Sequence, residues 1–277
     1  MALREAMIKN FTETEIKYLS GLIDADGSLL FHFTKYNETK YNVCLKLTLQ
    51  QSLSIDHNGK FMQSLPEYCG FNQFIEINKL KSTWSDAWRW SCNSTQDLNM
   101  LIPRLTKHMV IKARHFNNLL DKYNSIKGKS VTENEMKELK EFSISSRKDV
   151  GPLKDKKHPT WAWASGYIDG DGCYYMRSRK KNWGFSKELL VRVVAHDDDI
   201  VGIQLLYKAF GGNLKKNTHE NTWYWTRNLG NSDKSFAINF LRKMHFHTKL
   251  KKHKIEQLLN HHLQRLSESA STEDAIV

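Results

Sequence analysis

Two aspartates, each followed by glycine, close two stretches of nine residues that have the same pattern. The first stretch, Leu19–Gly27, reads LSGLIDADG, and the second, Ala164–Gly172, reads ASGYIDGDG. Two carboxylates held close together repel each other unless a cation joins them. Mg²⁺ is typically bound by one or two carboxylates together with phosphate oxygens, and paired divalent ions suit in-line cleavage of a phosphodiester. The repeat therefore predicts that Asp26 and Asp171 hold divalent metal, rather than merely ending two core helices.

A helix is expected to position each aspartate. Thr12 and Glu15 have the spacing of a capping box, and Pro159 suits the first turn of the second helix. Each helix also carries small residues four positions apart, which let two helix backbones approach closely. These are Gly21 with Ala25 and Gly166 with Gly170. If the two helices pack side by side, the aspartates at their ends lie together.

The same order of elements follows both stretches, which indicates an internal repeat. In residues 41–51 apolar side chains alternate with polar ones, and this predicts a half-buried strand. In the first copy we expect helices at 12–26, 52–68, 97–105 and 109–123, with strands at 27–36, 41–51, 71–80 and 83–92. In the second copy we expect helices at 160–170, 198–210, 234–244 and 248–266, with strands at 172–182, 186–195, 212–219 and 222–228.

The predicted fold class is α+β, with two pseudo-symmetric αββαββα half-domains. Each half-domain contains a four-stranded antiparallel sheet, and the two motif helices pack at the interface of the halves. The expected boundaries are 1–124 for the first half-domain and 159–266 for the second. Residues 125–158 are expected to form a linker with one short helix near 133–142, and residues 267–277 a polar tail.

The composition indicates a folded, intracellular protein with a polyanionic partner. Of the 277 residues 40% are hydrophobic, eight are Trp, and the formal net charge is +12. No apolar run of about 18 residues and no apolar signal-peptide core is found, so membrane contact and secretion are not expected. The thiols lack the spacing of a zinc site and are expected to be buried or half-buried in a reducing compartment. They are Cys44, Cys69, Cys92 and Cys173.

One face of each sheet is expected to bind an anionic partner, because the helices cover the other face. Counting by twos from each aspartate places hydrogen-bonding and cationic side chains on this face, and a two-stranded ribbon fits the major groove of DNA. A solvated face is the alternative for any single strand. The candidate DNA-binding residues are Ser28, His32, Thr34, Tyr36, Lys40, Asn42, Lys46, Thr48, Arg89, Tyr175, Arg177, Arg179, Lys181, Arg192, Asn213, Lys215 and Asn217.

The two nine-residue stretches resemble the paired motifs of single-chain LAGLIDADG homing endonucleases, and the resemblance extends from about Thr12 to about Leu266. It implies a monomer whose sheets saddle a long, non-palindromic site in double-stranded DNA and that cuts both strands. The implied cofactor is Mg²⁺, with Mn²⁺ able to substitute and Ca²⁺ supporting binding without cleavage. The implied setting is an organelle matrix or stroma, a bacterial cytoplasm or a phage-infected cell.

The resemblance also implies roles for single residues. The backbone carbonyls of Ala25 and Gly170 would assist the two aspartates in metal binding. A polar residue at the end of the second strand and a lysine near the start of the last helix would organise water and stabilise charge. Gln51 matches the first, with Gln50 as an alternative one residue earlier, and Lys112 and Lys251 match the second.

The second copy departs from this pattern. It has Val194-Ala195-His196-Asp197 where the glutamine is expected, so Ala195 takes the position, with His196 or Asp197 able to lean in. This predicts an asymmetric site and different cleavage rates for the two strands. Asp197–Asp199 are interpreted as acidic residues at a helix N-terminus. Asp24 and Asp169 point elsewhere on their helices and are interpreted as structural, in hydrogen bonds between the halves.

Two other functions use the same fold by resemblance. An intron maturase would bind host intron RNA as a splicing factor without cleavage, and a transcription regulator would bind DNA without chemistry. The acidic pair with Lys112 and Lys251 disfavours both. Five histidines near the C-terminus, His245, His247, His253, His261 and His262, have lysine-rich surroundings and no zinc spacing, so we interpret them as solvated or phosphate-facing.

Overall fold

The computed structural model describes residues 11–52, 60–69, 74–78, 87–148, 153, 156–181, 184–229 and 234–273. The chain forms two compact units, Met1–Lys157 and His158–Val277. Among the described residues no helix is both long and apolar enough to cross a membrane.

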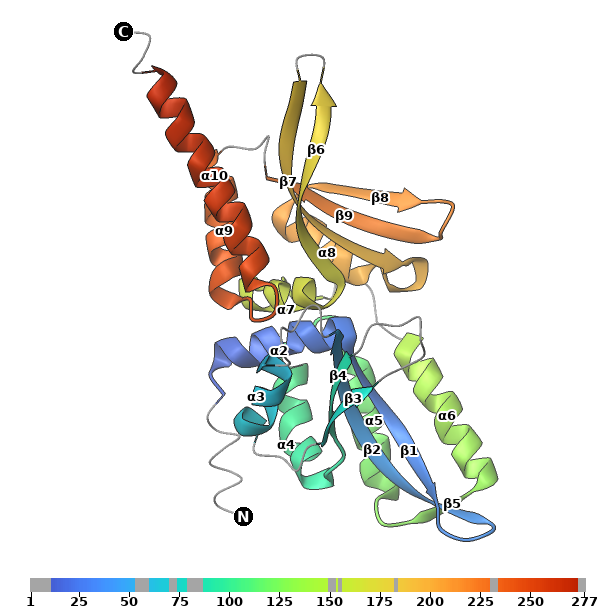
Figure 1. The fold of residues 1–277 in the computed structure, drawn as a ribbon. Coiled ribbons are helices and arrows are strands. Elements are labelled where there is room, and N and C mark those ends of the chain that lie inside the picture. Colours follow the sequence, from blue (N-terminus) through green and yellow to red (C-terminus); the bar gives the residue numbers. More distant parts are fainter. Residues whose placement is uncertain are drawn as a thin grey trace. The chain divides into compact units, whose positions relative to one another are not determined.

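The first unit is an antiparallel sheet with helices against one face (Figure 1). Its strands lie in the order β1-β2-β4-β3, and a short strand β5 pairs with the start of β2. Helices α4 and α5 pack on the sheet, and α6 packs on α5 and β1. The elements are α2 (Glu13–Asp26), β1 (Gly27–Lys35), β2 (Lys40–Ser52), α3 (Lys60–Cys69), β3 (Phe74–Asn78), β4 (Ala87–Cys92), α4 (Thr95–Thr106), α5 (Ala113–Ile126), β5 (Ser130–Thr132) and α6 (Glu133–Lys148).

The second unit repeats this plan. Its sheet has the order β6-β7-β9-β8, and α7 packs on α9 as α2 packs on α4. The elements are α7 (Trp161–Asp171), β6 (Gly172–Lys181), β7 (Gly184–His196), α8 (Val201–Phe210), β8 (Asn213–Asn217), β9 (Thr222–Asn228), α9 (Lys234–His247) and α10 (Lys252–Glu273), with a 3-10 turn (Asp197–Asp199) before α8.

Strand register makes the two copies equivalent residue by residue. Gly27 faces Leu49 across the first hairpin, and Gly172 faces Val193 across the second. In the next pairing Gln51 faces Trp88 and Ala195 faces Trp223. The α+β class and the two αββαββα copies with four-stranded antiparallel sheets are thus confirmed.

The predicted alternation in the second strand is also confirmed. Leu45, Leu47 and Leu49 are fully buried, whereas Asn42 is exposed and Lys46 and Thr48 are half-buried. Because successive side chains of a strand point to opposite faces, the leucines pack under the helices and the polar residues form the other face. Trp90 of β4 and Phe116 of α5 complete this core, and Trp163 and Trp225 are buried in the second unit.

Several predicted boundaries differ from those in the structure. The helix predicted at 109–123 begins at Ala113, because the backbone of residues 110–112 forms a turn around a buried carboxylate. Pro159 lies before the second motif helix, whose N-cap is Thr160. The capping box of Thr12 and Glu15 is present. Of the helix predicted at 52–68, residues 53–59 lie outside the described residues, and the helix starts at Lys60.

The segment predicted as a linker contributes to the first unit. Helix α6 is longer than the predicted 133–142, since it continues to Lys148, and β5 extends the sheet by pairing with residues 40–42. The predicted polar tail begins inside α10, which continues to Glu273.

The thiols also differ from the expectation in one case. Cys92 is buried and Cys44 is half-buried, but Cys173 is exposed because it faces away from the helices at the start of β6. The side chain of Cys69 lies outside the described residues.

A pair of leucines tests the assignment of the sheet faces. Leu47→Ala removes a fully buried side chain and is expected to lower the free energy of unfolding by about 2–5 kcal/mol. Leu30→Ala, on the adjacent strand, removes a side chain that is 38% exposed and should cost at most about 1 kcal/mol. Urea denaturation monitored by tryptophan fluorescence measures both. Equal losses would contradict the assignment.

Candidate active site

Asp26 and Asp171 are the last residues of α2 and α7, and both side chains are exposed. The glycine after each aspartate allows the strand to leave the helix at close range. A Cβ on Gly27 would lie 2.5 Å from Ile23 Cγ2, and one on Gly172 would lie 2.7 Å from Ile168 Cγ2. Any larger residue would therefore push the strand away from the helix, and with it the aspartate. This close approach explains the Asp-Gly pair of both motifs.

Two residues before, Asp24 binds a turn of its own unit. The carboxylate is 1% exposed and accepts hydrogen bonds from the backbone N–H groups of Val110 (2.7 Å), Ile111 (3.2 Å) and Lys112 (2.8 Å). These groups precede α5, so Asp24 fixes the start of α5 against the end of α2.

Asp169 does the same in the second unit. It is fully buried and accepts from the N–H groups of Lys249 (3.0 Å), Leu250 (3.0 Å) and Lys251 (3.3 Å). The interpretation of Asp24 and Asp169 as structural fits these contacts. These hydrogen bonds lie within each unit, where the turn offers three N–H donors, whereas the predicted bonds between the halves stay a prediction.

Each turn contains a lysine whose side chain contacts the end of the motif helix. Lys112 Nζ donates to the carbonyl oxygens of Ile23 (3.1 Å), Ala25 (2.9 Å) and Gly27 (2.9 Å). Carbonyls at a helix C-terminus lack partners within the helix and carry partial negative charge, so an ammonium group stabilises them.

Lys251 makes the equivalent contacts in the second unit and is 7% exposed. Its Nζ donates to the carbonyl oxygens of Ile168 (2.9 Å), Gly170 (3.3 Å) and Gly172. The two lysines that the family resemblance implies therefore lie beside the two predicted aspartates, in the same relation to the motif helix.

Gln51 contacts the exposed aspartate of the first unit. Its amide Nε2 donates to Asp26 Oδ2 at 2.5 Å, and its side chain is buried. Gln50, the alternative, lies on the opposite face of β2, where its Oε1 accepts from Arg89 at 3.0 Å. The geometry thus selects Gln51 over Gln50 as the partner of the aspartate.

In the second unit Ala195 occupies the position of Gln51, as the register shows. Asp197 is held by the ammonium of Lys216 (2.5 Å) and the indole N–H of Trp223, and the hydrogen bond from Lys216 lowers its pKa. His196 is exposed. The glutamine that contacts Asp26 in the first unit is thus replaced by alanine in the second. Asp197–Asp199 form a 3-10 turn, whereas α8 begins at Val201.

The donor atoms at each helix end suit a hard divalent cation. No group of three or more His, Cys, Asp or Glu gathers within the described ranges. The donors that each helix end offers to a metal are the carboxylate of Asp26 or Asp171 and the carbonyl of Ala25 or Gly170. Mg²⁺ prefers oxygen donors and usually keeps several coordination positions for phosphate and water, so this small set of oxygen donors fits it. Each carbonyl oxygen has two lone pairs, so the bond from the lysine leaves one for a metal.

In the first unit the predicted DNA-binding residues share one face of the sheet. Ser28, His32 and Thr34 of β1 are exposed, and Ser28 Oγ lies 2.6 Å from Thr48 Oγ1 on β2. Arg89 of β4 joins them through Gln50. The remaining predicted residues follow the same alternation or the hairpin turn, and they are Tyr36, Lys40, Asn42 and Lys46.

In the second unit this face is less open than predicted. Arg177 of β6 pairs with Glu188 of β7 at 2.6 Å, and Glu188 and Leu190 are each only 3% exposed. The guanidinium of Arg192 lies over the ring of Tyr224, 4.5 Å from its centroid. The other predicted residues on this face are Tyr175, Asn213, Lys215 and Asn217, while the side chains of Arg179 and Lys181 lie outside the described residues.

Three residues near these features were missed from the sequence. Glu188 lies two register steps from Arg192, so continuing the count by twos would have found it. Tyr224 lies on β9, and none of the predicted DNA-binding residues lies on that strand. Arg147 lies on α6, which has no counterpart among the described elements of the second unit, so the repeat carries no signal for it.

The sequence matches the family model described as LAGLIDADG endonuclease over residues 19–123 and 164–259. These ranges include both aspartates and both lysines. No curated protein sequence matches the chain significantly.

Solved structures of DNA complexes have a similar fold at low sequence identity. I-SmaMI bound to cleaved DNA has a TM-score of 0.69 and 16% identity, covering 94% of this chain and 93% of that chain. I-SmaMI bound to its uncleaved DNA target with calcium ions has a TM-score of 0.68 and 16% identity, covering 92% of each chain. I-GzeII in complex with its DNA target has a TM-score of 0.68 and 16% identity, covering 92% of this chain and 91% of that chain.

The buried carboxylate of Asp24 is expected to support the stability of the first unit. Asp24→Asn replaces one acceptor oxygen by an NH₂ group that cannot accept from the turn, and should lower the free energy of unfolding by roughly 2–4 kcal/mol. Asp121→Asn, an exposed position on α5, is the control and should change it by less than about 0.5 kcal/mol. Denaturant unfolding measures both, and equal stability of the two variants would contradict the role of the turn.

Proposed function

The chain belongs to the LAGLIDADG endonuclease family, and on this premise we propose that it is a site-specific, divalent-metal-dependent endonuclease. Its substrate is a long, non-palindromic site in double-stranded DNA, and each unit supplies one carboxylate-bearing centre for one strand. The observation that supports this best is the repeated arrangement of an exposed aspartate beside a lysine-capped helix end.

Divalent metal, Mg²⁺ or Mn²⁺, would activate water and neutralise charge on the phosphate. Asp26 and Asp171 are the residues that would hold it. Lys112 and Lys251 fix the last carbonyls of the motif helices, and their positive charge favours an anionic phosphate nearby. Gln51 orients the carboxylate of Asp26 through its amide.

The charge of the chain supports a nucleic-acid substrate. The net charge of +12 favours a polyanion, and the polar face of the first sheet carries Lys46 and Arg89 next to hydroxyl and amide groups that can hydrogen-bond to base edges. Ca²⁺ is expected to support binding without cleavage, in line with the description of I-SmaMI with uncleaved DNA and calcium ions.

The test is selection from a randomised duplex library, first with Mg²⁺ and then with Ca²⁺. Cleavage of an enriched long site in Mg²⁺, with binding alone in Ca²⁺, is the expected result. Binding without cleavage in both ions would overturn the proposal. Tighter binding to a folded intron RNA than to any duplex would then assign the chain to RNA, as in a maturase.

Asp26 and Asp171 are each expected to be required for double-strand cleavage. Asp26→Asn and Asp171→Asn keep side-chain volume but remove the charge that holds metal, so double-strand cleavage should fall by at least about 100-fold. Binding to the same duplex in Ca²⁺ should survive, as measured by fluorescence anisotropy. Asp121→Asn serves as the control for a lost surface carboxylate. If both motif variants cut at the rate of the unmodified protein, the assignment of the centres is wrong.

The two strands are expected to be cut at different rates, because Gln51 contacts Asp26 whereas Ala195 occupies the equivalent position in the second unit. Gln51→Ala should slow one strand by about 10- to 100-fold, the range for a lost hydrogen bond to a charged group. Ala195→Gln should speed the other strand. Single-turnover cleavage of a duplex with a different label on each strand measures both rates.

Gln96→Ala is the matched control, since it removes an exposed glutamine on α4, away from the polar face of the sheet. It should leave the ratio of the two strand rates unchanged. Equal slowing of both strands by Gln51→Ala would rule out the proposed asymmetry.

A further inference from the structure

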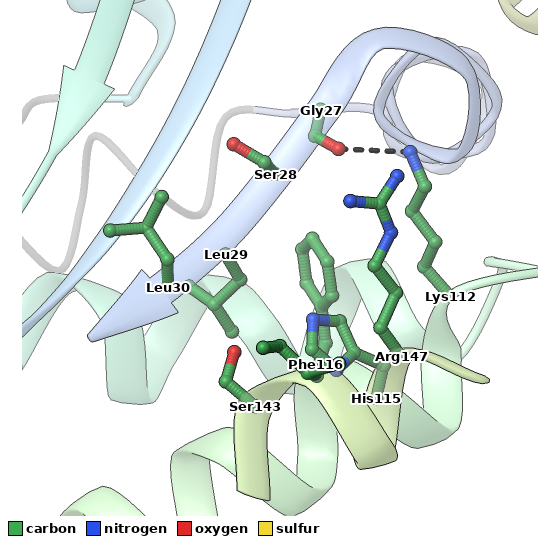
Figure 2. A pocket seen from close by; sticks show the side chains of 10 residues that line it. Gly27, Ser28, Leu29, Leu30, Lys112, His115, Phe116, Ser143 and Arg147 are labelled. Carbon is green, nitrogen blue, oxygen red and sulfur yellow. Dashed lines mark hydrogen bonds between the residues drawn. The ribbon is translucent and has the colours of Figure 1, made fainter. Parts of the chain in front are cut away.

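A cavity of about 170 Å³ lies in the first unit directly behind the start of β1. Figure 2 shows its lining, which comes from β1, from the turn and first residues of α5, and from α6. Gly27 and Ser28 border it on the strand side, and Gly27 is the residue that follows Asp26 in the sequence. The cavity is several times larger than the roughly 30 Å³ that one water occupies in the liquid, so it has room for a small ligand group.

The charged lining of this cavity is entirely cationic. Lys112 and Arg147 contribute positive charge, and no Asp or Glu occurs among the described residues that line it. In Figure 2 the guanidinium of Arg147 points toward the hydrogen bond between Lys112 and Gly27. Within the described residues no hydrogen bond or ion pair engages Arg147, and its side chain is exposed. Its five N–H donors are therefore available to an anion.

His115, which also lines the cavity, adds no charge at neutral pH. Burial lowers the pKa of its imidazole to about 4, and the positive charges of Arg147 and Lys112 act in the same direction. The hydroxyls of Ser28 and Ser143 are the other polar groups of the lining. Two cations with hydroxyl donors and no carboxylate match the chemistry of a phosphate group.

The helix that carries Arg147 is held in place at both ends. Near its N-terminus β5 pairs with β2, and Ser130 Oγ donates to Asn42 Oδ1 at 3.3 Å. Near its C-terminus Ser146 is buried, and its Oγ lies 3.2 Å from His115 Nδ1. The backbone of Arg147 is therefore fixed beside the cavity, and the planar guanidinium presents its donors in a fixed fork.

We propose that this cavity is a subsite for a backbone phosphate of the substrate strand, with Arg147 as its principal ligand. The proposal rests on the proposed endonuclease function. The bound phosphate is a neighbour of the reacting one, because the cavity begins directly after Asp26. Arg147 is thus a positioning residue, which holds the strand cut by the first unit. No described element of the second unit takes the place of α6, so this subsite serves one strand.

The first experiment measures strand-resolved, single-turnover cleavage by the full chain. Arg147→Ala should slow one strand by about 10- to 100-fold, the range for lost hydrogen bonds to a charged group. This strand should be the one slowed by Gln51→Ala, since both residues belong to the first unit. Arg147→Lys should recover only part of the rate, because an ammonium cannot form the bidentate contact.

Lys148→Ala is the matched control, because it removes one exposed positive charge from the same turn of α6 but does not line the cavity. It should leave the ratio of the two strand rates unchanged. If the ratio of the two strand rates changes equally in Lys148→Ala and Arg147→Ala, the change comes from the loss of any positive charge on α6. This result would overturn the subsite. An unchanged ratio in Arg147→Ala would also overturn it, while cleavage by the unmodified protein would leave the endonuclease function intact.

A second measurement is independent of cleavage. Inorganic phosphate is titrated into the full chain while the ring signals of His115 are followed by NMR. Saturable shifts in the unmodified protein that are absent in Arg147→Ala are expected, and equal shifts or no shifts in both would contradict the subsite. If the unmodified protein cuts no duplex, the endonuclease proposal fails, yet this titration still decides whether the cavity binds phosphate.

Discussion

The buried carboxylates of Asp24 and Asp169 are the contacts on which both candidate centres depend. Each accepts three backbone N–H groups from the turn before the last helix of its fold repeat. A carboxylate removed from water is costly unless its lone pairs are filled, and the turn fills them. The same contact fixes the backbone of Lys112 and Lys251. It therefore holds the lysine in place beside the helix end and the exposed aspartate.

This scaffold is nearly symmetric, but the groups around it are not. Gln51 partners Asp26 in the first unit, whereas Ala195 stands at that position in the second. The first unit adds α6 with Arg147, and the second places Arg177 in an ion pair with the buried Glu188. A duplicated fold thus preserves the contacts that hold the helix end, while the residues that would touch substrate have diverged.

Much of this arrangement follows from sequence pattern alone. Alternation in β2 and the Asp-Gly motif identify the sheet faces and the exposed aspartates, because strand period and helix termination are local properties. The place of Lys112 follows from the family resemblance and not from pattern alone. The bonds of Asp24 could not be predicted, because they join residues 86 positions apart through backbone atoms, which any sequence carries. Arg147 could not be predicted either, since α6 has no counterpart among the described elements of the second unit.

The pairing of β5 with β2 has a consequence for building chimeric proteins from this chain. Residues 40–42 have their outer backbone groups satisfied by residues 130–132, and α6 then covers β1 and α5. A transplanted module cut at the end of the sequence repeat, near residue 124, would carry an unpaired strand edge that invites intermolecular association. The transferable module of the first unit therefore extends to Lys148, beyond the limit that internal homology suggests.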